Sequence, residues 1–122
     1  MHILLIEPDK KLASTYVQAL RAEGYGVDWA TTAQGAVHLS DAQKPDLVIL
    51  ELQLSGHNGI EFIYEFRSYT EWQDIPIMLL TMSPPHALQI TQTTLDDFAI
   101  VACLYKPATS LKQLIRAVGD LV

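Results

Sequence analysis

The chain lacks several features by which whole classes of protein are recognised. Cys103 is its only cysteine, so no internal disulfide can form and a reducing compartment such as the cytoplasm is expected. No apolar run approaches the length of a membrane span, so we expect no contact with a membrane. The apolar start, residues 1–6, is interrupted at once by Glu7, so a signal peptide is not expected either.

Positive charge and phosphate-binding loops are also scarce. Eight Lys and Arg residues stand against 14 Asp and Glu residues, which leaves a formal net charge of −6. Gripping a nucleic-acid backbone needs clustered Lys and Arg, so direct nucleic-acid binding by this domain is not expected. The sequence has no GxGxxG or Walker motif, which gives a nucleotide-binding enzyme little support.

What the chain does have is a regular alternation of short apolar runs and helix-period segments. With 122 residues and 49% hydrophobic residues it can form one domain with a real core. Asp9, Thr32 and Ser110 are N-cap residue types, and they predict helices over 10–23, from 32 to about 43, and from 111 onward. A further helix is predicted after Gly59. Buried strands are predicted at residues 3–6, 27–30, 47–50, 77–80 and 100–104.

The stretch from residue 84 to residue 98 gives a weaker pattern. Its apolar stripe is thin, and residues 90–94 are rich in β-branched side chains, which are poor helix formers. We therefore expect a short or irregular fourth helix there.

Polar side chains follow four of the predicted strands. Strands that alternate with helices predict a doubly wound parallel α/β sheet covered on both faces. In such sheets the functional site lies at the carboxyl ends of the strands. Glu7, Glu51, Thr81 and Lys106 each lie at or just past such an end, so we expect them to converge.

These segments resemble the receiver domain of bacterial two-component response regulators. The resemblance rests on residues 3–7, 45–59 and 76–81 and on Lys106-Pro107, in this order along the chain. It implies five parallel strands in the order 2-1-3-4-5 with five helices. It also implies a single receiver domain over residues 1–122, either complete or the N-terminal part of a longer regulator.

The resemblance also implies roles for the convergent residues. In this family a histidine kinase donates a phosphoryl group to an Asp after the third strand, and Glu51 stands at that position. Thr81 and Lys106 match the hydroxyl and the lysine that engage the phosphoryl oxygens. The family's magnesium ion is held by that Asp, by an acidic pair and by a backbone carbonyl. Glu7 matches the first acid of the pair, and Gln53 matches the carbonyl donor.

The chain departs from the family pattern in ways that bear on chemistry. Glu51 carries one methylene more than Asp, which moves the carboxylate by about 1.5 Å, and a misplacement of that order can slow a reaction about 100-fold. Pro8 stands where the second acid belongs, which leaves Asp9 as the nearest substitute and predicts weak magnesium binding at most.

Cys103 stands where the family has a switching aromatic, three residues before the lysine. We interpret it as a small buried residue. Tyr105 is not expected to replace the aromatic, because neighbouring residues of a strand point to opposite faces. The resemblance further implies a cis peptide bond at Lys106–Pro107.

The sequence therefore favours a phosphorylation-independent signalling and interaction module without enzymatic activity. Glu51 then pairs with Lys106, either in a locked functional state or as an inert remnant. Two alternatives stay open, an active phosphoacceptor and a domain that binds a small ligand in the remodelled pocket.

The expected partners are other signalling proteins or a second receiver. They would bind at the face formed by the fourth helix, the fifth strand and the last helix. Residues 6–25 resemble receivers joined to winged-helix DNA-binding domains, so control of transcription through an attached domain is expected.

Overall fold

The computed structural model describes residues 1–54, 57–84 and 91–121 of the chain. Five parallel strands form one sheet in the order β2-β1-β3-β6-β7. This is the predicted order, because these strands are the second, first, third, fourth and fifth of the expected five. The strands are β1 (His2–Ile6), β2 (Gly26–Ala30), β3 (Leu47–Leu50), β6 (Ile77–Thr81) and β7 (Ile100–Tyr105).

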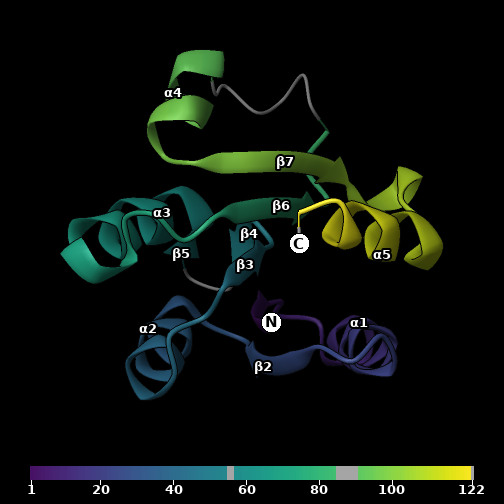
Figure 1. The fold of residues 1–122 in the computed structure, drawn as a ribbon. Helices are drawn as coiled ribbons and strands as arrows, with labels where there is room; N and C mark the ends of the chain where they lie inside the picture. The colour runs from purple at the N-terminus through teal and green to yellow at the C-terminus, as the bar shows by residue number, and fades with distance from the viewer. Residues whose placement is uncertain (55–56, 85–90, 122) are drawn as a thin grey trace.

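Helices cover both faces of this sheet (Figure 1). The α-helices are α1 (Lys10–Ala22), α2 (Ala33–Ala42), α3 (Gly59–Ser68), α4 (Gln92–Asp97) and α5 (Leu111–Gly119). Figure 1 shows α1 and α5 on one side and α2 and α3 on the other, with α4 beside β7. The expected doubly wound fold with five helices is confirmed.

The residues that were predicted to cap helices do cap them in the structure. The side chain of Asp9 accepts hydrogen bonds from the backbone N–H groups of Lys11 and Leu12 at the start of α1. Thr32 caps α2, and Ser110 forms a reciprocal capping box with Gln113 at α5. The fourth helix, α4, has six residues and is short, as expected.

Each face of the sheet has its own apolar core. On the α1 and α5 side, Leu20 and Leu114 pack with strand residues such as Ile49. On the α2 and α3 side, Phe62 and Phe66 pack against the opposite side chains of the same strands. β1, β3 and β6 are buried on both faces, as central strands of a doubly wound sheet are.

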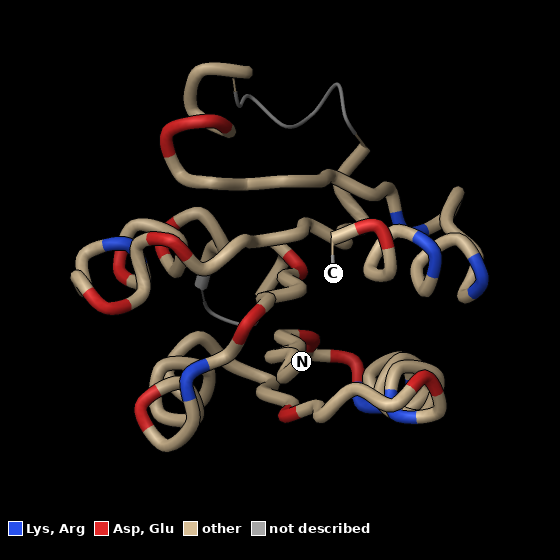
Figure 2. Tube along the Cα trace, in the orientation of Figure 1, with Lys and Arg blue, Asp and Glu red and all other residues tan. Residues whose placement is uncertain are grey.

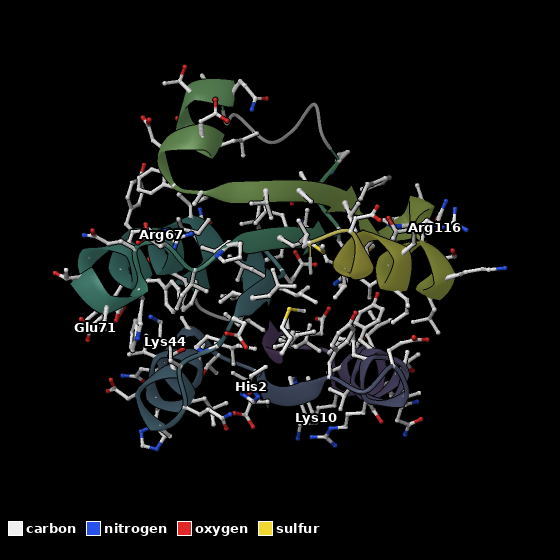
Figure 3. The ribbon with its side chains drawn as sticks, in the orientation of Figure 1. His2, Lys10, Lys44, Arg67, Glu71 and Arg116 are labelled. Atoms are coloured by element: carbon white, nitrogen blue, oxygen red, sulfur yellow. The ribbon has the colours of Figure 1, made fainter. Side chains whose placement is uncertain are left out.

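Arg67 is a buried cation that holds the α3 side together. Its guanidinium donates hydrogen bonds to the backbone carbonyls of Trp72 at 2.6 Å, Ile75 at 2.6 Å and Phe98 at 2.8 Å. Figure 3 shows Arg67 on α3, on the side that faces the sheet. The side chain thus ties α3 to the chain entering β6 and to the turn before β7.

Two features of the backbone differ from the expectation. The loop after β3 contains a small antiparallel pair, β4 (Gln53–Leu54) with β5 (His57–Asn58), that the sequence pattern does not reveal. The Lys106–Pro107 peptide is trans, since no cis peptide bond occurs in the described parts of the chain, so the implied cis bond is wrong. Lys106 begins a short 3-10 helix, Lys106–Ala108.

Candidate functional site

The four convergent residues of the prediction do meet at the carboxyl edge of the sheet. Glu7 follows β1, Glu51 follows β3, Thr81 ends β6 and Lys106 follows β7. All four are buried, with Glu51 only 3% exposed and Lys106 8% exposed. Parallel pairing in register brings these strand ends together although the residues are far apart in sequence.

Lys106 lies between the two carboxylates. Its Nζ is 2.5 Å from Oε1 of Glu7 and 2.7 Å from Oε1 of Glu51. Two carboxylates and one ammonium leave this cluster with a formal charge of −1. The side chain of Glu7 is held from the other end by the backbone N–H of Asp9, which donates to Oε2 at 3.0 Å.

The carboxylate of Glu51 is the most heavily hydrogen-bonded group of the site. Oε1 accepts from Lys106 and from the backbone N–H of Met82 at 3.0 Å. Oε2 accepts from the hydroxyl of Thr81 at 2.5 Å and from the backbone N–H of Gln53 at 3.0 Å. One carboxylate therefore joins the loop after β3 to the loop after β6.

The protonation of the cluster follows from these contacts. Burial alone would raise the pKa of Glu51, but the hydrogen bonds from Lys106, Thr81 and two backbone N–H groups outweigh it and lower the pKa below the ordinary value. Burial alone would lower the pKa of Lys106, and its bonds to Glu51 and Glu7 raise it instead. Both groups are therefore charged at neutral pH.

The residues present do not fit the magnesium ion of the family. Magnesium needs several oxygen ligands with near-octahedral geometry, but Lys106 already occupies Oε1 of both Glu7 and Glu51. Asp9 is exposed and its side chain caps α1, so it does not replace the acid missing at Pro8. Over residues 1–54, 57–84 and 91–121, no group of three or more His, Cys, Asp or Glu side chains could hold a metal.

Gln53 contacts the site through its backbone N–H and its side chain, while the magnesium-binding role expected of its backbone carbonyl stays a prediction. Its backbone N–H binds Glu51, and its side-chain Nε2 donates to the hydroxyl of Ser83 at 2.9 Å. The backbone N–H of Ser83 in turn donates to Thr81 Oγ1 at 3.1 Å. Met82 and Ser83 were missed in the sequence, because a backbone N–H leaves no residue-type signal.

Cys103 and Tyr105 differ from the expectation. Cys103 is exposed rather than buried, and desolvation by its neighbours raises the pKa of its thiol, which keeps it protonated at neutral pH. Cys103 pairs with Leu79, and Tyr105 pairs with Thr81. Residues two apart on a strand share a face, so Tyr105 lies on the same face as Cys103, not on the opposite one.

Comparison with known proteins identifies the family to which the chain belongs. A family model for the response regulator receiver domain matches residues 3–118. The chain belongs to this family. The receiver domain is 30% identical over 119 residues to the transcriptional regulatory protein QseB of Haemophilus influenzae, covering 95% of this chain and 53% of that protein. It is 35% identical over 83 residues to BasR of Escherichia coli, covering 66% of this chain and 36% of that protein.

Solved structures agree with this assignment. The receiver domain of HemR from Leptospira biflexa, in its non-phosphorylated form, superposes with a TM-score of 0.80 at 28% identity, covering 98% of this chain and 92% of that one. The chemotaxis protein CheY4 of Vibrio cholerae has the same fold, with a TM-score of 0.84 at 18% identity over 99% of this chain and 98% of that one. The chain thus covers 92% of the HemR receiver domain, about half of QseB and about a third of BasR.

Proposed function

We propose that this receiver domain is a phosphorylation-independent signalling module without enzymatic activity, held in a single state by Glu51. One observation supports the proposal. The carboxylate of Glu51 already receives the hydroxyl of Thr81 and the ammonium of Lys106. The resemblance to the family implies that these two groups engage a phosphoryl group when one is present.

The geometry also leaves Glu51 poorly placed to accept a phosphoryl group. A carboxylate has about four lone-pair sites for hydrogen bonds, and four donors reach Glu51. Attack on phosphorus would have to break at least one of these bonds. Without a fitting metal site, the charge of the incoming phosphoryl group would also meet the net negative cluster with no divalent cation to offset it.

Control of transcription is the setting that the relatives support. QseB and BasR are named as transcriptional regulatory proteins. QseB is about twice as long as the part of it that this chain matches, and BasR is nearly three times as long as its matched part. We propose that the receiver domain works in the cytoplasm and passes its state to a DNA-binding domain or to another signalling protein. No described helix is long and apolar enough to cross a membrane.

The proposed contact surface for a second receiver is the face of α4, β7 and α5. Asp96 and Asp97 on α4 are exposed, as are Lys112 and Arg116 on α5. Figure 2 shows acidic residues on α4 and basic residues on α5, at opposite ends of this face. None of the four forms an ion pair with another described residue. A two-fold axis would place the acids of one copy against the bases of the other.

Sedimentation velocity tests this surface. We expect Asp97→Lys to weaken self-association and the added Lys112→Glu to restore it, because the double change reverses both partners of the pair. Equal weakening by each change, without restoration, would contradict the pairing. A monomer at all concentrations would direct the search to a different partner protein.

The proposal that the site does not accept a phosphoryl group is tested by intact mass spectrometry after incubation with acetyl phosphate and magnesium. Transfer would form a bond between a carboxylate oxygen and phosphorus as the bond from phosphorus to acetate breaks. We expect no adduct on the native chain. The variant that combines Pro8→Asp with Glu51→Asp rebuilds the acidic pair and the shorter acceptor, and we expect it to be labelled.

The single variant Glu51→Asp separates two possible reasons why the site is not phosphorylated, the extra methylene of Glu51 and the acid missing at Pro8. Labelling of this single variant would mean that the extra methylene alone blocks a competent site. No labelling of it, with labelling of the double variant, would mean that the missing acid matters as well. An adduct on the native chain would overturn the proposal and make this domain an active phosphoacceptor.

A further inference from the structure

A groove lies beside the buried cluster on the α1 and α5 side of the sheet. Its volume is about 380 Å³, which falls within the range of small-molecule sites. Its apolar walls come from the start of α1, the loop after β6, the 3-10 helix after β7 and the start of α5, namely from Leu12, Met82, Pro107 and Leu111. Figure 1 shows α1 and α5 on the same side of the sheet, and residues of both helices line the groove.

Two side chains of the apolar walls are open to solvent. Met82 is 48% exposed and Leu111 is 39% exposed. An apolar body placed between them would remove both side chains from water, which is favourable in proportion to the area covered.

Tyr16 lines this groove and carries a hydroxyl. The residue is only 7% exposed, and its hydroxyl makes no hydrogen bond to any described residue. Every fully buried polar side-chain atom in the described parts of the chain has a partner. The hydroxyl is therefore not fully buried, and Tyr16 is one of the residues that line the groove.

Lys106 supplies a second available donor. An ammonium has three N–H donors, and two of them are taken by Glu7 and Glu51. The residues that line the groove thus carry a hydroxyl, an ammonium with a third N–H, and apolar side chains. Thr15 and Thr109 also line it, and each hydroxyl donates to a backbone carbonyl and keeps lone pairs free to accept.

The charge of the cluster decides which ligand chemistry fits. An anion would meet Glu7 and Glu51, whose negative charges exceed the single positive charge of Lys106. A cation would meet the Lys106 donor directly. A neutral carbonyl accepts from Lys106 and Tyr16 without either penalty.

We propose that the groove between α1 and the start of α5 binds a small neutral carbonyl compound, such as an amide, with an apolar body of on the order of ten non-hydrogen atoms. The carbonyl oxygen accepts from Lys106 and Tyr16, and the apolar body lies between Met82 and Leu111. The site is independent of phosphoryl transfer, so it does not rest on the function proposed above.

Methionine-methyl NMR tests the site directly. The chain has three methionines, of which Met82 lines the groove, Met78 is fully buried in the sheet and Met1 lies at the N-terminus. Titration with 3-phenylpropanamide should shift the Met82 methyl signal, with a dissociation constant on the order of 1 mM. The signals of Met78 and Met1 should stay in place.

The anion 3-phenylpropanoate has nearly the same size and shape as the amide. We expect it to bind at least about tenfold more weakly, because the cluster already carries net negative charge. Equal affinity for amide and anion would overturn the assignment of a neutral ligand. A Met82 signal that stays unmoved by the amide would overturn the site itself.

Two pairs of variants complete the test. Tyr16→Phe removes the hydroxyl and should weaken amide binding about three- to tenfold, whereas Tyr64→Phe makes the same change on the exposed surface of α3 and should leave it unchanged. Leu111→Gln should weaken binding, and Leu121→Gln, at a similarly exposed leucine of the C-terminal segment, should not. An unchanged Met78 signal shows that each variant keeps its core. Equal effects within either pair would overturn the proposal.

Discussion

The Nζ of Lys106 lies 2.7 Å from Oε1 of Glu51, across 55 residues of sequence and from one strand end to another. The longer arm of Glu51 lets its carboxylate reach this ammonium while also bonding the ends of two loops. Because the carboxylate of Glu51 already accepts hydrogen bonds from these donors, they do not require a phosphoryl group to accept them. The departure from Asp is therefore a structural feature of the site as well as a chemical one.

The replacement of Glu51 by Gln removes the charge and keeps the size of the side chain. The amide replaces one carboxylate oxygen by an NH₂ group, which then faces the two donors that bonded that oxygen, so hydrogen bonds on that side are lost. We expect the free energy of unfolding to fall by about 2 kcal/mol. Urea denaturation monitored by circular dichroism measures the change.

The matched control is Glu61→Gln on the exposed surface of α3. It should change the unfolding free energy by less than about 0.5 kcal/mol. Equal effects of the two substitutions would show that the contacts of Glu51 contribute nothing measurable to stability.

The pH dependence of stability follows from the direction of the Glu51 shift. The pKa of Glu51 is lower in the folded protein than the ordinary value of 4.5, so the folded state gains stability from the ionised group above that value. This contribution is lost as the pH falls through the lowered folded pKa. Unfolding free energies measured between about pH 3 and pH 7 should fall less steeply toward acid in Glu51→Gln than in the native chain. Parallel curves for the two proteins would contradict the lowered pKa.

Magnesium should leave the native domain unaffected. Lys106 bonds both carboxylates that face the site, and Asp9 caps α1, so the ion finds no adequate set of oxygens. We expect thermal unfolding with about 10 mM MgCl₂ to match unfolding at the same ionic strength with NaCl.

The variant that combines Pro8→Asp with Glu51→Asp is the positive control for magnesium. With a dissociation constant on the order of 1 mM it would gain about 1.4 kcal/mol at 10 mM, a shift of several degrees in Tm. A comparable shift of the native chain would show that Glu7 and Glu51 bind the ion despite Lys106.

Most of the fold could be predicted from the sequence because the helix caps, the apolar runs and the order of the elements all indicate the same architecture. Helix caps at Asp9, Thr32 and Ser110 and buried runs such as residues 47–50 each specify one element, and their order specifies a doubly wound sheet. The strand ends then predict that Glu7, Glu51, Thr81 and Lys106 meet.

The remaining details depend on geometry that residue types do not encode. From its residue type, Asp9 could be a helix cap or a metal ligand. The structure shows it as a cap, because the backbone N–H groups of Lys11 and Leu12 donate to its carboxylate. The donors on Met82 and Gln53 are backbone groups common to every residue. Strand alternation assigns a face to Cys103, but whether that face is covered depends on a fourth helix that has only six residues.

Gly59 offers the last test, because it positions the loop that carries Gln53. A Cβ built on Gly59 would lie 2.7 Å from Cα of Leu52, closer than real contacts allow, and the nearest atom is backbone that cannot rotate away. The backbone N–H of Gly59 also donates to the carbonyl of Leu52 at 2.8 Å. We expect Gly59→Ala to push this loop outward and to lower the unfolding free energy by about 1–3 kcal/mol.

Gly119→Ala is the matched control, since Gly119 ends α5 with no atom within 4 Å of a built Cβ. Ala is the better helix former, so this change should leave stability equal or slightly higher. Because displacement of the loop would also move the N–H of Gln53 away from Glu51, the amide signal of Gln53 in a ¹⁵N NMR spectrum should shift in Gly59→Ala and stay in place in Gly119→Ala. A loss of stability without that shift would mean that the packing at Leu52 and the binding of Glu51 are independent.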